Sequence, residues 1–385
     1  MKNVLALNCG SSSLKFGVYA CDAVNCRLVL EGEAEEVGSK EGTFWVKDGV
    51  GTKLSDKKLR LENLGEAAKH AFDVVAQRKL YIDIVGHRVV HGGPQVLEHT
   101  LLTPQIFKQL TQAEDFAPLH VPPALEVMKA AQASFGDVPQ VACLDTAFHR
   151  DLPLVSRCFP LPKEYFDEGV RRYGAHGLSL ESILEQLGDG IPPRLVIAHL
   201  GNGASITAVH KGKSIDTTMG LTPTGGVMMG TRTGDIDPGV LLYLRRKEAL
   251  AADALEQLVD RKSGLLGVSG VTRDMRELRQ LSRTNDDARL AVDMFCYQVA
   301  KAIAAMAVAL YGIDMIVFTG GIGEHDAATR AEVCARLRFA NVLLDEKKNA
   351  AASSEVQSDG SVCVIRVMPS QEDVRIAQIA ARIVQ

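Results

Sequence analysis

The chain has 385 residues, of which 46% are hydrophobic and 23% charged, and its formal net charge is -4. This length favours two domains over one, and the near-average composition excludes extensive disorder. The small negative charge gives no electrostatic reason to expect nucleic acid or an anionic membrane as a partner.

The N-terminal stretch MKNVLALNCG lacks the long apolar core of a signal peptide, so we expect the mature chain to begin here. The longest apolar stretch, 302–313, has about a dozen residues against the roughly 20 that span a bilayer, and it predicts a buried helix. The eight cysteines form no CxxC pair and no metal-ligand spacing. We therefore expect reduced thiols and a cytoplasmic protein.

Two β-hairpins with small polar tips are predicted about half a chain apart. Residues 3–20 place apolar runs on both sides of a tip at 8–13, and residues 195–209 repeat this arrangement around GNGA. Two similar tips indicate duplicated halves. The remaining patterns predict strands at 82–90 and 138–144, helices at 64–76, 124–133, 180–187 and 287–311, and a polar helix and turn at 344–361.

The first hairpin tip, within NCGSSSLKF at 8–16, has the composition of an anion-binding turn. Small residues let backbone N–H groups and hydroxyls approach an anion, and Lys15 adds positive charge, although the Walker spacing is absent. For this segment alone, a serine-rich structural turn is an equal alternative. The second tip favours phosphate binding, because two such turns facing one cleft would hold a polyphosphate from both sides.

Two arginines lie among glycines. Arg88 interrupts the apolar run in GHRVVHGG, so it either forms a structural ion pair or faces a ligand. Arg232 lies in MMGTRTGDIDPG, where Asp235 or Asp237 is equally suited to capping a helix that starts at Pro238. Guanidinium groups match the oxygens of phosphates and carboxylates, so both arginines suit a reaction that concentrates negative charge.

Three further polar residues have a structural interpretation beside a functional one. His120 in PLHVPP and His176 in RRYGAHG are, taken singly, more typical of packing or capping than of catalysis. Asp145 in LDTAFH ends a predicted buried strand, where α/β proteins place ligand-facing groups, or it caps the following turn.

The segment FTGGIGEHD at 318–326 places glycines between an apolar strand and a predicted helix. Its spacing is not GxGxxG, and it lies near the end of the chain instead of in a first βαβ unit, which excludes a Rossmann fingerprint. On its own the segment is either a tight corner or a nucleotide-binding turn.

Nine motifs, taken in order, resemble the acetate kinase family along the whole chain from residue 4 to 379. They are NCGSSSLKF, GHRVVHGG, PLHVPP, LDTAFH, RRYGAHG, HLGNGAS, MMGTRTGDIDPG, SGVTRDMRE and FTGGIGE. The resemblance implies an α/β fold of the acetate and sugar kinase, Hsp70 and actin superfamily, with two duplicated ribonuclease H-like (actin-like ATPase) domains around a nucleotide cleft. We expect these domains at 1–144 plus 374–385 and at 145–373.

The resemblance also implies roles for individual residues. It places the catalytic groups at Asp145, Arg88, Arg232, His176 and Asn202, and the carboxylate pocket at Arg88, Val90, Leu119, Ala175 and Pro223. It implies metal binding at Asn8 and Glu372, with Asp145 supporting the metal and the phosphoryl group. The implied nucleotide positions are Ser13, Lys15, His199, Gly201, Asn202, Gly203, Asp274, Met275, Arg276, Gly320, Gly321, Ile322, Gly323 and His325.

The implied reaction is reversible phosphorylation of acetate or another short-chain carboxylate by ATP, with Mg²⁺ or Mn²⁺. A carboxylic acid with a pKa of about 4.3 is already an anion at neutral pH and needs no general base. The barrier is the approach of two anions, which arginines, a histidine donor and a metal ion lower. We therefore expect direct in-line transfer without a covalent enzyme intermediate. The resemblance also implies a homodimer formed through the C-terminal half.

Some residues depart from the family pattern. Ala175 stands where phenylalanine is usual, which predicts a pocket that tolerates propionate or butyrate, unless a neighbour such as Met228 fills the space. His325 and Met275 also depart from the family pattern, at positions that the resemblance places beside the nucleotide. We therefore expect the chain to use a nucleotide, and selectivity for adenine is the less secure part of that expectation.

The superfamily also contains ATP-driven chaperones and filament proteins, in which the nucleotide drives a conformational change without an acceptor. The combination of Arg88, Arg232 and His176 favours the kinase, because a simple ATPase site has no second anion to neutralise.

Overall fold

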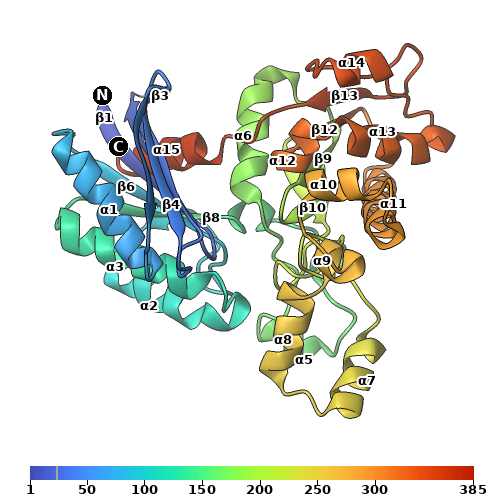
Figure 1. Ribbon diagram of the computed structural model, residues 1–385, viewed down its shortest axis with the longest axis horizontal. Coiled ribbons are helices and arrows are strands. Elements are labelled where there is room, and N and C mark those ends of the chain that lie inside the picture. The colour runs from blue at the N-terminus through green and yellow to red at the C-terminus, as the bar shows by residue number, and fades with distance from the viewer. Residues whose placement is uncertain (23–24) are drawn as a thin grey trace. The chain divides into compact units, whose positions relative to one another are not determined.

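The computed structural model describes residues 1–22 and 25–385 and consists of two compact units, each built on one β-sheet (Figure 1). The first unit contains Met1–Arg150, Ala175–Ser182 and Gln371–Gln385, and the second contains Asp151–Gly174 and Ile183–Ser370. The first unit thus includes 175–182, which the predicted domains assign to the second half. The predicted domain boundaries themselves stay a prediction.

The first unit has a mixed sheet with the strand order β5-β4-β3-β2-β1-β6-β8-β7. Strand β1 pairs antiparallel with β2 and parallel with β6, and β6 pairs parallel with β8. The strands are β1 (Lys2–Cys9), β2 (Leu14–Cys21), β3 (Cys26–Glu35), β4 (Gly42–Asp48), β5 (Lys53–Leu59), β6 (Ile84–Val89), β7 (Thr100–Leu101) and β8 (Gln140–Leu144).

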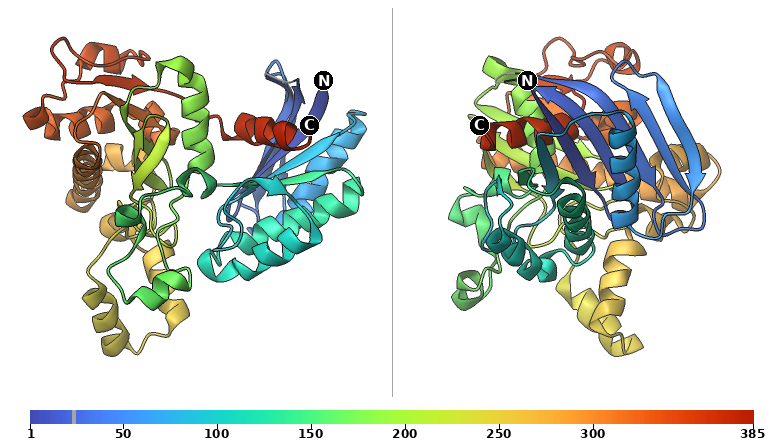
Figure 2. Two further views of the ribbon diagram at one scale, coloured as in Figure 1. Left: turned by 180° about the vertical axis from the view of Figure 1, so that it is seen from behind. Right: turned by 90° about the vertical axis from the view of Figure 1, so that its left-hand side faces the viewer.

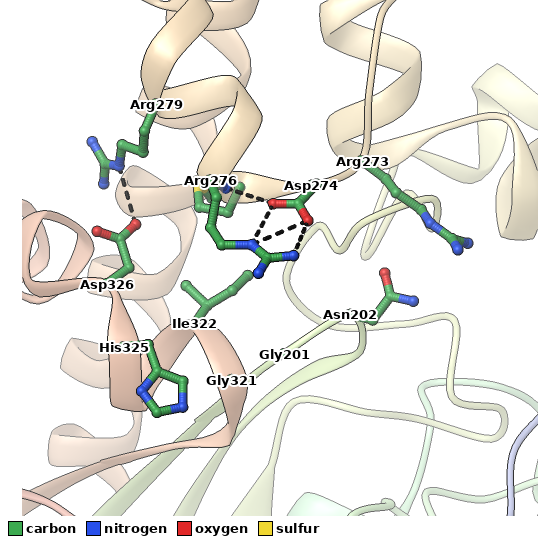
Figure 3. A pocket seen from close by; sticks show the side chains of 11 residues that line it. Gly201, Asn202, Arg273, Asp274, Arg276, Arg279, Gly321, Ile322, His325 and Asp326 are labelled. Atoms are coloured by element: carbon green, nitrogen blue, oxygen red, sulfur yellow. Dashed lines mark hydrogen bonds and ion pairs between the residues drawn. The ribbon is translucent and has the colours of Figure 1, made fainter. Parts of the chain in front are cut away.

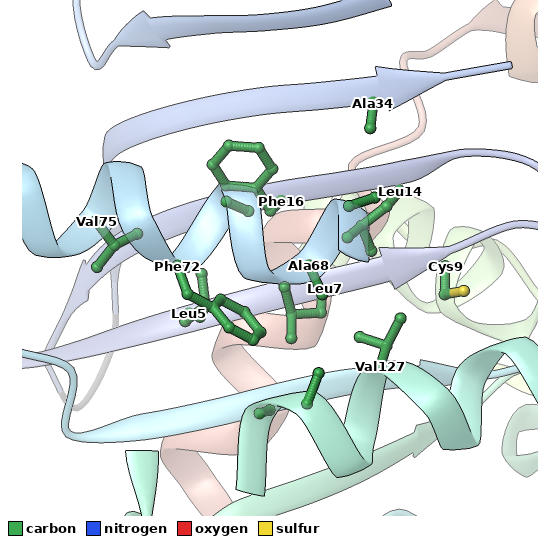
Figure 4. Packing of buried hydrophobic residues seen from close by; sticks show 14 of the residues in the cluster. Leu5, Leu7, Cys9, Leu14, Phe16, Ala34, Ala68, Phe72, Val75 and Val127 are labelled. Atoms are coloured by element: carbon green, nitrogen blue, oxygen red, sulfur yellow. The ribbon is translucent and has the colours of Figure 1, made fainter. Parts of the chain in front are cut away.

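Helices cover both faces of this sheet (Figures 1 and 2). Side chains alternate along β1, so Leu5 and Leu7 pack under the helices on one face while Val4 and Ala6 pack against the C-terminal helix on the other. Figure 4 shows Leu5 and Leu7 beside Phe72. The helices are α1 (Leu64–Gln77), α2 (Pro104–Gln112), α3 (Val121–Phe135) and α15 (Glu372–Ile383), with 3₁₀ turns at Glu114–Phe116 and Ala147–His149.

Helix α15 approaches β6 closely because Gly86 has no side chain. A Cβ at this position would lie 2.7 Å from Ile376 Cγ2 and 3.2 Å from the Ala380 methyl group. The end of the chain therefore packs against strands from its first quarter, which places the beginning of α15 beside the carboxyl end of β1.

The second unit has the strand order β11-β10-β9-β12-β13. Its strands are β9 (Arg194–Leu200), β10 (Ala204–His210), β11 (Lys213–Thr217), β12 (Met315–Thr319) and β13 (Val364–Val367). Its helices are α4 (Leu154–Arg157), α5 (Lys163–Asp167), α7 (Pro238–Glu248), α8 (Ala252–Arg261), α9 (Gly264–Ser269), α10 (Met275–Leu281), α11 (Asp286–Ala309), α12 (Gly320–His325), α13 (Ala327–Arg336) and α14 (Glu346–Ala350), with 3₁₀ turns at Gly188–Gly190 and Arg338–Ala340. Helix α6 (Gly177–Leu187) begins in the first unit and ends in the second.

The two sheets share one plan, which confirms the predicted duplication. In the first sheet β1 pairs antiparallel with β2 and parallel with β6, which pairs parallel with β8. In the second sheet β9 pairs in the same way with β10 and β12, and β12 pairs parallel with β13. The core order β3-β2-β1-β6-β8 thus corresponds to β11-β10-β9-β12-β13. Both predicted hairpins are present as β1–β2 and β9–β10.

The predicted helices are present with shifted ends. Helices α1 and α11 match their predictions closely, helped by Asn63 and Asn285, whose side chains accept from backbone N–H groups of the first turn. Helices α3 and α6 begin at Val121 and Gly177, earlier than predicted. Of the polar segment 344–361, α14 is the helical part.

The end of α11 corrects the expectation of a buried helix at 302–313. Val308 is 76% exposed and Tyr311, just past the helix, is 94% exposed, whereas Ile303 and Met306 are buried. Within the described residues, α11 is the one helix that is long and apolar enough to cross a membrane, a test that core helices of globular proteins also pass.

A disulfide between Cys21 and Cys26 corrects the expectation of reduced thiols. Antiparallel pairing of β2 and β3 sets these residues opposite each other, with their Cα atoms 4.1 Å apart. The expectation rested on CxxC and metal-ligand spacings, which do not capture a pair that meets across a hairpin. The remaining six cysteines are free, and all but Cys158 are buried.

Candidate active site

The carboxyl ends of β1, β6 and β8 bring three predicted site residues together in the first unit. Arg88 donates from Nε and Nη2 to Asp145 Oδ2, at 2.9 and 2.7 Å, and from Nη1 to Asn8 Oδ1 at 3.2 Å. These parallel strands are neighbours and end at the same edge, so their terminal side chains meet there. The ion-pair interpretation of Arg88 is therefore confirmed, and it places the guanidinium beside two candidate ligand groups.

The first turn of α15 adds two carboxylates to this cluster. Asn8 Nδ2 donates to Glu372 Oε2 at 3.1 Å and to Asp373 Oδ1 at 2.8 Å. The sequence analysis singled out Glu372 and missed Asp373. Acidic side chains at the start of a helix interact favourably with the helix dipole. The two adjacent acidic residues in QEDVRIA were therefore the sequence pattern that could have pointed to Asp373.

Burial and charge oppose each other in this cluster. Burial raises the pKa of Asp145, and the Arg88 charge opposes the rise. Burial lowers the pKa of Arg88, but the charges of Asp145 and Glu372 outweigh it and hold that pKa above its usual range. Burial also raises the pKa of Asp373 against the hydrogen bond from Asn8. We conclude that Arg88 stays charged, with Asp145 as its ion-pair partner.

Asp145 has a spare acceptor. Its Oδ1 is buried and has no hydrogen-bond partner among the described residues, whereas Oδ2 takes both bonds from Arg88. Buried carboxylate oxygens are rarely left without a partner, so this atom is suited to a ligand or a bound metal ion.

His176 lies against Asp145 in a strained backbone conformation. Its φ is 59°, in the left-handed region that disfavours residues with a side chain. Gly177 N donates to the Asp145 carbonyl oxygen at 2.9 Å, and a Cβ on Gly177 would clash with that oxygen. The first turn of α6 is therefore fixed against Asp145, with the buried His176 directly before it.

The predicted carboxylate-pocket residues divide between the two units. Val90 and Ala175 are buried and Leu119 is half-buried in the first unit. Arg232 and Pro223 lie together in the second, where Arg232 Nη1 donates to the Pro223 carbonyl oxygen at 3.2 Å. The structure thus places Arg232 beside one predicted pocket residue.

A pocket of about 680 Å³ in the second unit gathers most of the predicted nucleotide residues (Figure 3). Its size is within the range of small-ligand sites. The predicted residues that line it are Gly201, Asn202, Asp274, Met275, Arg276, Gly321, Ile322 and His325, and the residues that the sequence analysis missed are Arg273, Arg279 and Asp326.

Two caps shape the rim of this pocket. Asp274 accepts from Arg276 N at the start of α10 and forms an ion pair with the Arg276 guanidinium at 2.6 Å (Figure 3). Arg279 donates from Nε at 3.1 Å to Asp326, which caps α13. Arg279 lies one turn after Met275 on α10, a helical spacing that signals a shared face.

Glycines and a buried arginine hold α12 at the floor of the pocket. Gly320 has a φ of 76°, and a Cβ there would lie 2.8 Å from the Leu200 carbonyl oxygen, whereas a Cβ on Gly321 meets nothing within 4 Å. Gly323 is buried. Arg330, 1% exposed and not singled out from the sequence, donates at 2.9 Å to the carbonyl oxygens of Gly323 and Glu324.

The other predicted residues lie at the hairpin tips. Gly10 N donates to the Ser13 carbonyl oxygen at 2.8 Å, and Gly201 N donates to that of Gly203 at 2.9 Å, so each tip is closed by a backbone hydrogen bond. Lys15 lies opposite Asn8 in the hairpin register and is half exposed. The remaining nucleotide candidate, His199, is buried in β9.

Helix α7 resolves the alternative for Asp235 and Asp237. Asp237 caps the helix by accepting from Gly239 N at 2.8 Å, and Pro238 is its first residue. Asp235 instead accepts from Gly226 N at 2.7 Å. The capping interpretation is therefore confirmed for Asp237.

The cluster around Asn8 contains carboxylate oxygens, the type of ligand that Mg²⁺ takes from proteins. Among the described residues, no group of three or more His, Cys, Asp or Glu side chains is arranged to hold a metal ion. Mg²⁺ takes one or two carboxylates and completes its shell with water and phosphate oxygens. The spare Oδ1 of Asp145 and the carboxylates beside Asn8 fit that requirement.

A family model described as the Acetokinase family matches residues 3–378. The chain belongs to the acetokinase family. This family comprises phosphotransferases with a carboxylate acceptor that use ATP as co-substrate, and its two-domain actin-like fold agrees with the duplicated sheets.

Relatives of the family match over full length. An acetate kinase of Dichelobacter nodosus is 39% identical over 393 residues, covering 100% of this chain and 99% of the relative, and one of Oceanobacillus iheyensis is 37% identical over 396 residues, covering 100% and 99%. A crystal structure of Porphyromonas gingivalis acetate kinase has a TM-score of 0.88 at 34% identity and covers both chains completely. A propionate kinase from Francisella tularensis has a TM-score of 0.93 at 35% identity, covering 99% and 100%, so structural likeness alone does not distinguish acyl chains.

The Arg88–Asp145 pair generates a stability prediction. Asp145→Leu leaves the Arg88 charge without its partner and is expected to lower the free energy of unfolding by about 3 kcal/mol. The double variant Arg88→Met/Asp145→Leu removes both charges and should recover part of that loss, as measured by urea denaturation. A double variant less stable than Asp145→Leu would contradict the prediction.

Proposed function

We propose that this chain transfers the γ-phosphate of ATP directly to acetate, giving acetyl phosphate and ADP, and that it also accepts propionate. The observation that supports this most is the largely buried Arg88, held by Asp145 and Asn8 beside an acceptor oxygen that has no partner among the described residues. Such a site handles negative charge, and an acceptor that is already anionic requires charge neutralisation more than proton transfer.

In this proposal the side chains neutralise and align two anions. Arg88 and Arg232 bind the substrate carboxylate and the moving phosphoryl group, His176 donates a hydrogen bond to that group, and Asn202 contacts the phosphates. A carboxylate oxygen attacks the γ-phosphorus while the bond to the bridging oxygen breaks, and ADP leaves as an anion. No proton moves, so no general base and no phospho-enzyme are needed.

We propose that Mg²⁺ is held beside Asn8 by Glu372 and Asp145, directly or through water. The bound ion supplies charge that neutralises the phosphate oxygens. Asn8 positions the site by accepting from Arg88 and donating to Glu372 and Asp373 at the same time. Ser13 and Lys15 on the neighbouring hairpin tip complete the proposed phosphate side of the site.

We propose that adenosine occupies the pocket of the second unit, with its base along Gly321 and Ile322 (Figure 3). The pocket is lined by α10, α12 and the β9–β10 tip, and Arg279 and Asp326 form its closed side. The backbone of Gly321 is open to the pocket, because a Cβ there would contact no protein atom within 4 Å.

The acyl chain that the site accepts depends on Ala175. We propose that its small side chain removes a wall that a phenylalanine would form, and each CH₂ that a substrate buries contributes roughly 0.8 kcal/mol. We expect kcat/KM for propionate within about fivefold of that for acetate, and Ala175→Phe should lower the propionate value at least about tenfold relative to acetate. Trapping the acyl phosphate as a hydroxamate measures all three acids, including butyrate.

Two outcomes of this series would contradict the proposal. A steep fall from acetate to propionate in the unmodified chain would contradict the wide pocket. Release of inorganic phosphate without hydroxamate, with every acid, would exclude the kinase reaction itself and favour a nucleotide-driven switch. Ala175→Val is the milder variant for use if the phenylalanine variant does not fold.

Gly321→Ala separates nucleotide contact from folding. The added methyl group meets no protein atom, so the melting temperature should be unchanged, whereas a base lying on Gly321 would be displaced and the KM for ATP should rise about tenfold, equivalent to about 1.4 kcal/mol. Gly320→Ala is the matched control, because its positive φ and the Leu200 carbonyl oxygen predict lower stability instead. An unchanged KM for ATP in Gly321→Ala would place the base elsewhere.

We also propose that the chain forms a homodimer through its second unit. Val308, Tyr311 and Phe339 are 76%, 94% and 81% exposed, and they border an apolar groove between α11 and the segment after α13. Clustered exposed apolar side chains mark association surfaces. Light scattering should give twice the chain mass, and Tyr311→Glu with Val308→Glu should shift it toward the monomer; a monomeric unmodified chain would refute this surface.

A further inference from the structure

We infer that His99, Glu181 and Arg375 form a positioning triad that fixes the candidate active site of the first unit. None of the three belongs to the predicted site, and none contacts the Arg88–Asp145–Asn8 cluster in a described hydrogen bond. The inference rests on the proposed function, since it assigns these residues to the alignment of the same reacting groups.

The triad is a continuous series of hydrogen bonds. Leu144 N donates to His99 Nδ1 at 3.0 Å, His99 Nε2 lies 3.1 Å from Glu181 Oε1, and Arg375 Nε donates to Glu181 Oε2 at 2.9 Å. The first bond defines the tautomer: because Nδ1 accepts, the proton is on Nε2, which donates to Glu181. Each carboxylate oxygen of Glu181 therefore has its own donor.

Each end of the series lies next to a proposed catalytic or metal-binding group. Leu144 is the last residue of β8 and directly precedes Asp145. Glu181 is on α6, the helix that follows His176, and Arg375 is in the first turns of α15, which begins at Glu372. The triad thus connects the three elements that carry Asp145, His176 and Glu372.

A second contact connects α6 and α15 at the same level. Gln371 N donates to Ser182 Oγ at 3.1 Å, and Gln371 immediately precedes Glu372. Two consecutive residues of α6, Glu181 and Ser182, thereby hold the beginning of α15. The first turn of α15 is therefore oriented by hydrogen bonds to α6 as well as by the packing of α15 on the sheet.

Low exposure restricts the motion of the three side chains of the triad. The side chains of His99, Glu181 and Arg375 are 16%, 13% and 13% exposed. Burial raises the pKa of Glu181, but His99 and Arg375 outweigh that effect and hold the pKa below its usual range. A buried carboxylate with a donor on each oxygen has little freedom to reorient, unlike an ion pair on the surface.

Such residues act on the rate through geometry. Outer residues that orient functional groups typically change activity 10–100-fold when removed, because small displacements of the reacting groups lower the rate steeply. Loss of the triad should therefore reduce kcat much more than it changes the KM for ATP, because most of the proposed nucleotide contacts belong to the second-unit pocket.

The test compares disruptive with conservative variants by steady-state kinetics and thermal unfolding. His99→Leu and Glu181→Gln should lower kcat for acetyl phosphate formation about tenfold, with the KM for ATP within about twofold. His99→Gln should restore at least half of the activity, because its amide can accept from Leu144 N and donate to Glu181. Glu355→Gln is the matched control: it breaks the 2.6 Å ion pair with Arg366 in the second unit and should leave kcat unchanged.

A double variant shows whether the residues act as one unit. His99→Leu combined with Arg375→Leu should lower kcat no further than the stronger single variant, because both act through Glu181. If a leucine variant does not fold, Arg375→Lys keeps the charge but loses the Nε donor, and it should show the same selective loss of kcat.

The outcomes distinguish the triad from the function on which it rests. A lower melting temperature with unchanged kcat in His99→Leu and Arg375→Lys would show a purely stabilising role and overturn the triad, while acyl phosphate formation by the unmodified chain would still support the proposed function. Failure of the unmodified chain to form acyl phosphate would overturn both.

Discussion

The charge of Arg88, largely buried at the end of β6, is the constraint on which the first unit depends. A largely buried guanidinium is costly unless its charge and its N–H groups have close partners. Asp145 neutralises the charge and Asn8 accepts a hydrogen bond, each from the end of a neighbouring strand. Asn8 in turn requires acceptors for its amide group, and Glu372 supplies one of them from 364 positions further along the chain. The return of α15 to the first sheet is therefore part of the same charge arrangement, with Gly86 providing the close approach.

The two sheets have the same core strand order but carry different functional groups at their strand ends. In the first unit the strand ends carry amide, guanidinium and carboxylate groups, whereas in the second the corresponding edge is formed by the backbone of Gly201, Gly203 and Gly320. Charged side chains suit the neutralisation of anions, and bare backbone suits the close approach of a flat base. One topology thus carries different functional groups when the residues at its strand ends change, and the proposed function assigns one role to each set.

The sequence predicts those features that depend on local pattern. Alternating apolar residues around small tips predict both hairpins, and a charge within an apolar, glycine-flanked segment singles out Arg88. The residues of the second-unit pocket were instead implied by the resemblance to the family. The start of α6 is not predictable in this way, because Gly177 disfavours a helix and is required only by contact with the Asp145 carbonyl oxygen. The Cys21–Cys26 disulfide and the Glu181–Arg375 pair likewise depend on strand register and on helices far apart in sequence.

Burial is the property that composition predicts least well, as the end of α11 demonstrates. An apolar run predicts that a helix has hydrophobic faces, but it does not show whether other elements of the same chain pack against each face. Ile303 and Met306 face the interior, whereas Val308 does not.

The backbone at His176 gives an independent reason to regard this part of the structure as functional. A residue with a φ of 59° and a side chain on its Cα costs on the order of 1 kcal/mol or more, and such strain persists only where its surroundings impose it. Here Gly177 N is bonded to Asp145, and Leu180 N is bonded to the His176 carbonyl oxygen, so both strand β8 and helix α6 enforce the conformation. A glycine would adopt the same φ without this cost. The bond from Gly177 N to the Asp145 carbonyl oxygen therefore sets where the backbone of His176 lies relative to Asp145.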